Sequence, residues 1–159
     1  MNEDIYKIYK IIEKACIELY ENDFYLIDNR VNERAIVFRF GIYVQELIDK
    51  NKFFDNYNLD NEYNRNIKDP KSFSNAENGV YPDLIIHHRG DNEHNLLIIE
   101  CKTEWNSDVD RDIHKIRKFV DKKGIYKYRY GLSMIFEINK VECKFIEDGK
   151  QDINKTINL

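Results

Sequence analysis

The chain has 159 residues, enough for one compact domain, and its 42% hydrophobic content excludes a disordered protein. Its formal net charge of −4 argues against a protein that binds nucleic acid through bulk positive charge, although active-site carboxylates would add to that total. Because no repeat or linker divides the sequence, we expect a single domain over residues 1–159.

Two amphipathic helices are predicted in the first fifty residues. Apolar residues recur at steps of three and four from Asp4 to Glu21, which indicates the first helix. We expect residues 24–27 to form a short apolar connection. A second helix follows over 31–50, with Asp28 or Asn29 as its N-cap.

The middle of the chain contains the next predicted strands. Alternating apolar and polar residues within 53–65 indicate a half-exposed strand, and 66–79 is predicted to be a loop. Strands follow over 84–88 and 95–103, joined by a turn at 90–93. The second of these is mostly apolar, so we expect it at the centre of a sheet.

A third helix is predicted over 109–120, followed by strands over 130–138 and 141–146 with a tight turn at 139–140. The order of elements is therefore α-α-β-β-β-α-β-β. A helix between two strands is typical of a crossover within one sheet. The predicted fold class is α/β, with a central mixed β-sheet flanked by helices.

The sequence also bears on location. The longest apolar runs are too short to span a bilayer, and residues 1–20 carry acids and lysines, unlike a secretory signal. Cys16, Cys101 and Cys143 are far apart, which predicts buried free thiols. We therefore expect a cytoplasmic protein with no membrane partner.

The main candidate site combines Asp83 with Glu100 and Lys102. Side chains alternate faces along a strand, so Glu100 and Lys102 point the same way and Cys101 points to the opposite face. If the strands on either side of Gly90 pair as a hairpin, Asp83 comes near Glu100. Two carboxylates suit Mg²⁺ or Mn²⁺, and Lys102 can orient a water or stabilise charge on a phosphate.

Glu33 is a candidate third carboxylate. It begins the second predicted helix on the same stripe as Ile36, Val37 and Phe40. An acid aimed along an apolar stripe needs a partner, which a second metal or a metal-bound water would supply. The alternative is an acid favoured only by the dipole at the start of its helix.

These residues resemble the signature of the PD-(D/E)XK nuclease family, with Pro82-Asp83, Glu100-Cys101-Lys102 and the segment 32–35 as its motifs. The order of elements over 28–138 is similar to that family's core. The resemblance implies a restriction-endonuclease-like fold with an extra N-terminal helix. It implies that Asp83 and Glu100 bind metal, that Lys102 acts in catalysis and that Glu33 contacts metal or water.

The implied activity is Mg²⁺- or Mn²⁺-dependent hydrolysis of phosphodiester bonds in nucleic acid, more plausibly DNA than RNA. A homodimer is a further option, because nucleases that cut both strands often use two sites. One alternative is a binding module on a nuclease-like fold that does not cut, for example in a phage or defence complex. The other is an unrelated interaction domain, in which Asp83 and Glu100 would point apart.

Several other polar residues have two interpretations. Glu62, Glu104 and the helix segment 112–116, with Lys115 near an active-site rim, can extend the site or lie on solvated surfaces. Trp105 can stack on a base or pack against the core. Scattered cations can form a phosphate-binding rim or plain surface: Lys71, His88, Arg89, Lys122, Lys123, Lys127 and Arg129.

Three histidines, His87, His88 and His94, raise the question of zinc. Adjacent strand histidines point to opposite faces and make a poor ligand pair, so we do not predict a zinc site. His87 shares a strand face with Asp83 and is a candidate for lining the same pocket.

Overall fold

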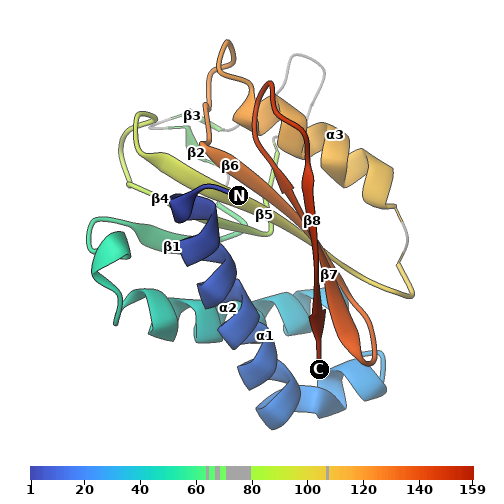
Figure 1. Cartoon of the computed structure of the whole chain (residues 1–159). Coiled ribbons are helices and arrows are strands. Elements are labelled where there is room, and N and C mark those ends of the chain that lie inside the picture. Colours follow the sequence, from blue (N-terminus) through green and yellow to red (C-terminus); the bar gives the residue numbers. More distant parts are fainter. Residues whose placement is uncertain (64, 67–68, 71–79, 107) are drawn as a thin grey trace.

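A computed structural model of the chain describes residues 1–63, 65–66, 69–70, 80–106 and 108–159 (Figure 1). The described elements, in chain order, are α1 (Glu3–Asp28), α2 (Glu33–Ile48), the 3₁₀ helix η1 (Lys52–Phe54), β1 (Asn58–Asn61), β2 (Arg65–Asn66), β3 (Asp69–Pro70), β4 (Leu84–His87), β5 (Asn95–Thr103), α3 (Val109–Val120), β6 (Tyr130–Phe136), β7 (Lys140–Ile146) and β8 (Ile153–Asn158). This is the predicted α/β class.

One six-stranded mixed sheet forms the centre of the fold, in the order β1-β4-β5-β6-β7-β8. Strands β5 and β6 pair in parallel, and the other neighbours in this sheet pair antiparallel. Helix α3 makes the crossover that a parallel pair requires. The central position predicted for the 95–103 strand is confirmed. Strands β2 and β3 pair with each other in a separate small sheet.

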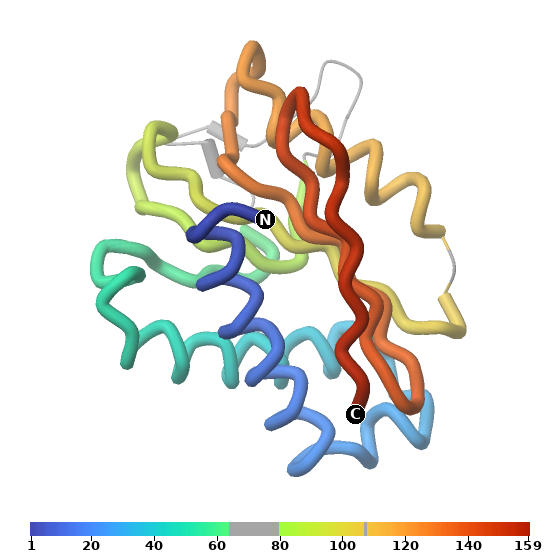
Figure 2. The backbone as a smooth tube through the Cα atoms, in the orientation of Figure 1, coloured from blue at the N-terminus to red at the C-terminus, as the bar shows by residue number. Residues whose placement is uncertain are grey.

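Helices cover both faces of the sheet, with α1 and α2 on one side and α3 on the other (Figures 1 and 2). Side chains alternate between the two faces of β5 and so contribute to both hydrophobic cores. Leu97 and Cys101 belong to the larger core under α1 and α2, and Ile98 belongs to the smaller core under α3. The contact between α3 and β6 is close, since a Cβ added at Gly131 would lie 2.1 Å from Cγ2 of Ile116. Gly131 therefore allows α3 to dock.

The predicted connection at 24–27 is wrong, because α1 continues to Asp28. Asp23 has non-helical backbone angles, φ −130° and ψ 24°, so the helix kinks there without ending. Its carboxylate accepts hydrogen bonds from Arg39 Nε at 2.9 Å and from the Tyr43 hydroxyl at 2.5 Å. The kink is thus held against α2 by these hydrogen bonds. Ile27, which follows the kink, is fully buried.

The predicted N-cap of the second helix is also wrong. Asn32 caps α2 by accepting a hydrogen bond from the Arg34 amide at 2.9 Å, in place of Asp28 or Asn29. Arg30, with φ 49°, lies in the turn that separates the two helices.

Two strand predictions differ from the structure. The region 53–65 begins inside η1, where the rings of Phe53 and Phe54 pack edge to face, and only Asn58–Asn61 joins the main sheet. Most of the predicted loop 66–79 lies outside the described residues. Strand β8 was not predicted, because its residues are mainly polar and only Ile157 is buried. It nevertheless pairs with β7 along its length.

The three cysteines are free and buried, as predicted. Within the part of the chain that the structure describes, no helix combines the length and the apolar character needed to cross a membrane.

Candidate functional site

The β4–β5 hairpin brings Asp83 beside Glu100. Leu84 pairs with Ile99 across the hairpin, so the residue before β4 lies next to the continuation of β5. Oδ2 of Asp83 accepts a hydrogen bond from the Cys101 amide at 2.8 Å. Strand β4 has not yet begun at Asp83, so this carboxylate takes the place of a strand partner for β5. The hairpin pairing and this hydrogen bond therefore hold Asp83 close to Glu100, as predicted.

Glu100 is buried, with 3% of its surface exposed, and pairs with Lys115 from α3. Nζ of Lys115 lies 2.7 Å from Oε1 and 2.8 Å from Oε2, and it also donates to the Tyr81 carbonyl at 2.6 Å. Only the Oε2 contact has hydrogen-bond geometry. Among the described residues, no group donates a hydrogen bond to the buried Oε1 atom.

Lys102 joins two further carboxylates. Its Nζ atom lies 3.1 Å from Oε1 of Glu33 and 3.3 Å from Oδ2 of Asp112. The second oxygen of Glu33 accepts a hydrogen bond from Asn106 Nδ2 at 3.1 Å. Oδ2 of Asp112 is buried and, within the described chain, accepts no hydrogen bond, since the Lys102 contact is misaligned. Glu33, for which a metal or a metal-bound water was the expected partner, pairs with Lys102 within the described chain.

We call these six residues the carboxylate–lysine cluster: Glu33, Asp83, Glu100, Lys102, Asp112 and Lys115. Four carboxylates face two ammonium groups, which leaves an excess of negative charge when all are ionised. The cluster draws on α2, the start of β4, β5 and α3. Such an excess in a partly buried site favours a bound cation.

Burial is the largest influence on the pKa of three acids in the cluster, Glu100, Asp83 and Asp112. It raises the pKa of Glu100 to about 8, although Lys115 opposes the shift. Burial also raises the pKa of Asp83 against the Cys101 amide, and that of Asp112 against Lys102. Desolvation alone would lower the pKa of Lys102, but Glu33 and Asp112 outweigh it and raise that pKa to about 12. Lys102 therefore stays protonated at neutral pH.

An open cavity of about 460 Å³ gives access to the cluster. Its lining residues are Tyr81, Asp83, Glu100, Lys102, Asn106, Asp108, Arg111, Asp112 and Lys115. Glu33 lies instead on a cavity of about 20 Å³, which it shares with Asp83 and Glu62. Asp83 thus contributes to both spaces. The larger cavity is polar and large enough for part of a substrate.

The structure brings together Asp83, Glu100, Lys102 and Glu33, the four residues singled out in the sequence. It adds Asp112 and Lys115, which lie three positions apart on α3 and share a helix face. Of the two readings of segment 112–116, the solvated face is wrong for these two side chains. Asp112 lies next to the buried stripe that includes Ile116, the same kind of signal that pointed to Glu33.

The other acidic and aromatic candidates lie outside the cluster. Glu62 pairs with Arg34 at 3.3 Å, and Glu104 is exposed. His87 is buried and bonds to Asp60 at 2.8 Å, so it does not line the 460 Å³ cavity as expected. Trp105 packs against the larger core, which favours the packing interpretation.

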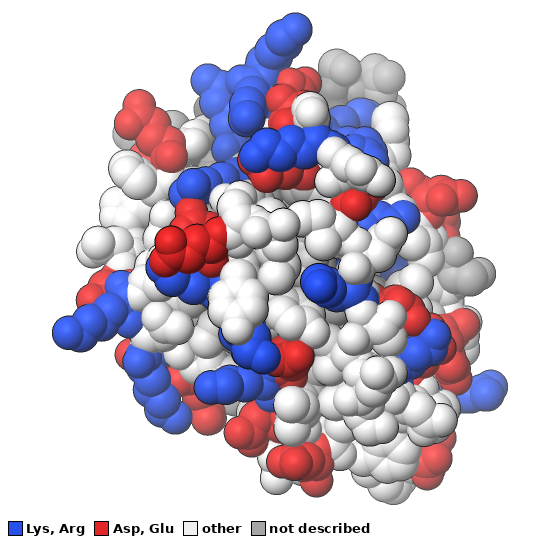
Figure 3. Space-filling model, viewed as in Figure 1, with Lys and Arg blue, Asp and Glu red and all other residues white. Residues whose placement is uncertain are grey.

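Two of the scattered cations pair with acidic side chains. Arg89 pairs with Asp60, and Arg129 lies 2.8 Å from Asp4. Lys71 lies outside the described residues. On the face seen in Figure 3, basic and acidic side chains are intermixed.

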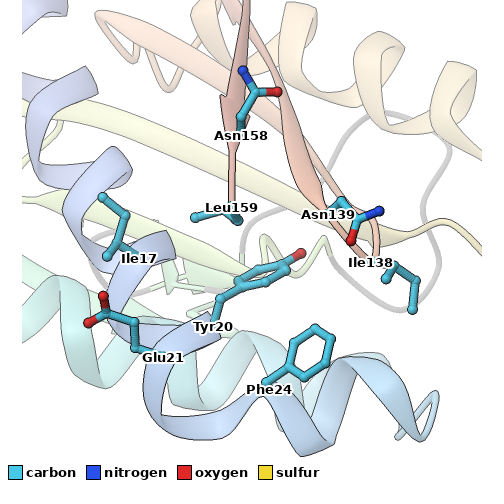
Figure 4. A pocket seen from close by; sticks show the side chains of 8 residues that line it. All are labelled: Ile17, Tyr20, Glu21, Phe24, Ile138, Asn139, Asn158 and Leu159. Carbon is cyan, nitrogen blue, oxygen red and sulfur yellow. The ribbon is translucent and has the colours of Figure 1, made fainter.

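A second groove of about 460 Å³ lies between the C-terminal half of α1 and the ends of β6 and β8 (Figure 4). It is lined by Ile17, Tyr20, Glu21, Phe24, Ile138, Asn139, Asn158 and Leu159. Its lining has one carboxylate and no lysine, arginine or histidine. It therefore offers shape and apolar contact but no group of residues suited to catalysis.

The sequence matches no protein-family model and no curated protein. Function must therefore be inferred from the carboxylate–lysine cluster itself.

Proposed function

We propose that this protein is a divalent-metal-dependent nuclease of the PD-(D/E)XK type, which hydrolyses phosphodiester bonds in nucleic acid, with DNA preferred over RNA. The observation that carries the proposal is that Asp83, Glu100 and Lys102 line one open cavity. The order of helix, antiparallel strands, crossover helix and parallel strand supports it. On this reading the fold is restriction-endonuclease-like, and α1 is an addition to the core.

The residues fit a hard divalent cation such as Mg²⁺ or Mn²⁺. Asp83 and Glu100 would hold it, because carboxylate oxygens are the ligands these ions prefer. Oε1 of Glu100 is buried and, among the described residues, receives no hydrogen bond, although the Lys115 ammonium lies 2.7 Å away, so its hydrogen-bonding capacity is unsatisfied. When bound, such an ion stabilises negative charge on a phosphate and acidifies water.

Lys102 supplies a fixed positive charge beside that position. Glu33 and Asp112 hold its ammonium from two sides and keep it protonated. It therefore acts by orienting a water or by stabilising charge on the phosphate, and not as a base. Glu33, which also contacts Asn106, positions Lys102 and assists at the edge of the site.

One contact favours a second function. Lys115 already neutralises Glu100, the acid that a metal would need. A protein that keeps this ion pair permanently would be a binding module for nucleic acid or for a protein partner, without cleavage. In the nuclease, by contrast, Lys115 must release one carboxylate oxygen when a cation enters.

Cleavage of a labelled panel tests the proposal: single-stranded, duplex, branched and circular DNA, together with RNA, each with Mg²⁺, Mn²⁺ or EDTA. Wild type is compared with Asp83→Ala and Lys102→Ala. Glu104→Gln and Lys123→Met are matched controls, because both side chains are exposed and outside the cavity. Metal-dependent cleavage that only the first two variants lose supports the nuclease. Metal-independent binding without cleavage supports the binding module.

A further inference from the structure

We infer that the turn between β4 and β5 is a second metal site, in which His88, Asp91 and His94 bind a divalent transition metal such as Zn²⁺. This site does not depend on the proposed nuclease function. It uses different ligands and lies at the opposite end of β4 from Asp83. His88 lies five positions after Asp83, which corresponds to roughly 16 Å of extended chain.

The three side chains already have the spacing of a metal site. One ligand atom from each residue lies within 4.8 Å of the others. Nδ1 of His88 is 2.6 Å from Oδ2 of Asp91, and Nδ1 of His94 is 3.2 Å from Oδ1. Bonds of about 2.0–2.1 Å to tetrahedral zinc place neighbouring ligand atoms roughly 3.3 Å apart. Only a small adjustment of the side chains is needed to admit the ion.

The backbone holds these ligands in place. The amides of Glu93 and His94 both donate to Oδ1 of Asp91 at 3.0 Å, and Gly90 takes φ 95° to close the turn. The His88 amide donates to the His94 carbonyl at 3.2 Å, so the two histidines face each other across the hairpin. Loss of conformational freedom on binding is therefore confined to two side-chain rings.

The donor set selects the class of metal. Two imidazole nitrogens and one carboxylate suit Zn²⁺ and its neighbours in the transition series, whereas Mg²⁺ prefers oxygen ligands alone. His88 mainly, with the amides and His94, lowers the pKa of Asp91 to about 2, so this ligand is ionised at neutral pH. The metal would replace the direct contact between His88 Nδ1 and Asp91 Oδ2.

Three protein ligands leave a fourth zinc position free. The side chains of His88 and His94 are 49% and 63% exposed, so an ion can enter from solvent. A cavity of about 280 Å³ adjoins them and is also lined by Asn56 and Tyr57. The free position can thus hold a water or a small exogenous ligand.

His87 is not part of this site although it is adjacent in sequence. Its Nε2 atom bonds to Asp60, which also binds Arg89. Its side chain is 4% exposed, so metal cannot reach it without rearrangement of the sheet. The two adjacent histidines therefore have separate partners.

The test is zinc titration of tag-free, EDTA-stripped full-length protein by calorimetry, repeated with Co²⁺ by absorption. We expect one Zn²⁺ per chain, unaffected by millimolar Mg²⁺. His88→Asn and His94→Asn should each weaken binding at least tenfold, and zinc should raise the melting temperature of wild type but not of His94→Asn. His114→Asn is the matched control, because His114 is an exposed histidine on α3. Glu100→Gln should also retain zinc.

Two results would overturn the site. One is the absence of stoichiometric zinc binding by wild type. The other is binding that His88→Asn and His94→Asn leave intact, or that His114→Asn weakens equally. Circular dichroism of each variant verifies its fold, and both ligand histidines are exposed enough for substitution to be tolerated.

Discussion

The two ends of the β4–β5 hairpin place carboxylates in opposite surroundings. At one end Glu100 is buried between sheet and α3, and burial raises its pKa to about 8. At the other end Asp91 lies in an open turn, where imidazoles and amides lower its pKa to about 2. The same hairpin thus carries one buried acid that accepts a hydrogen bond from Lys115 and one partly exposed acid with several hydrogen-bond partners. The difference indicates that burial and donor supply, rather than residue type, decide how strongly each acid needs a cation.

The largest effect is expected at the buried end. Asp83→Ala and Lys102→Ala should each reduce metal-dependent cleavage by on the order of 10²-fold or more, because each removes a charge that the transition state needs. Initial rates on the preferred substrate measure this loss. Equal rates for wild type and either variant would remove the residue from the catalytic role. His94→Asn, at the exposed end, should leave the rate unchanged.

Lys115→Met tests the buried ion pair. Glu100 would lose its nearest positive partner, so the free energy of unfolding should fall by about 3 kcal/mol, more at pH 9 than at pH 6, where Glu100 takes up a proton. Urea denaturation measures the change. Lys115→Met combined with Glu100→Gln should recover most of the loss. A double variant no more stable than the single one would show that Lys115 acts mainly through Tyr81.

The pH dependence of stability distinguishes the two ends further. The pKa of Glu100 is raised from 4.5 to about 8 on folding, so the folded chain keeps a proton that the unfolded chain releases. Its contribution to stability is fully present below about pH 4.5 and is lost as the pH rises to about 8.

Metal-free wild type should therefore lose stability between these values, by on the order of a few kcal/mol. The decrease in stability with rising pH should be smaller for Glu100→Gln, and smaller for wild type in saturating Mg²⁺. Some slope should remain, since Asp83 and Asp112 shift in the same direction. Denaturant midpoints measured across this pH range provide the comparison, and identical slopes for wild type and variant would contradict it.

The smallest effect is expected for Asp91→Asn in EDTA. The side chain is partly exposed in a turn, and the amide oxygen of Asn can still accept the two backbone hydrogen bonds. We expect a decrease in melting temperature smaller than that of Lys115→Met. Added Zn²⁺ should increase the difference in melting temperature between wild type and Asp91→Asn. A difference that zinc leaves unchanged would count against the proposed site of His88, Asp91 and His94.

Local patterns predicted the parts of the site that depend on a single strand. The bounds of β5 are those expected, and the shared face of Glu100 and Lys102 follows from alternation alone. Glu33 was found because an acid on an apolar stripe needs a partner. Asp112 and Lys115 were left open, since which face of α3 meets the sheet depends on docking and not on the helix sequence. Within the loop predicted over 66–79, the described residues Asp69–Pro70 instead pair with Arg65–Asn66 in a small sheet.

The grouping of His88, Asp91 and His94 was not predicted, for a different reason. His88 was compared with His87, its neighbour on a strand, and alternation correctly separates those two. Its actual partners are Asp91 and His94, at steps of three across a turn, so strand geometry no longer applies. Strand β8 was missed because an edge strand with polar residues lacks the apolar alternation that marks a half-buried strand.

The parallel pairing of β5 with β6 has a consequence for how the protein acquires its site. Residues from Glu33 to Lys115 meet in the cluster, and α3 packs against β5 and also against β6, where Gly131 leaves room for Ile116. During synthesis, α2 and the hairpin can form early, but closure of the crossover waits for β6 to emerge. The carboxylates stay solvated until that moment. The carboxylate–lysine cluster is therefore assembled only after the second half of the chain has been made.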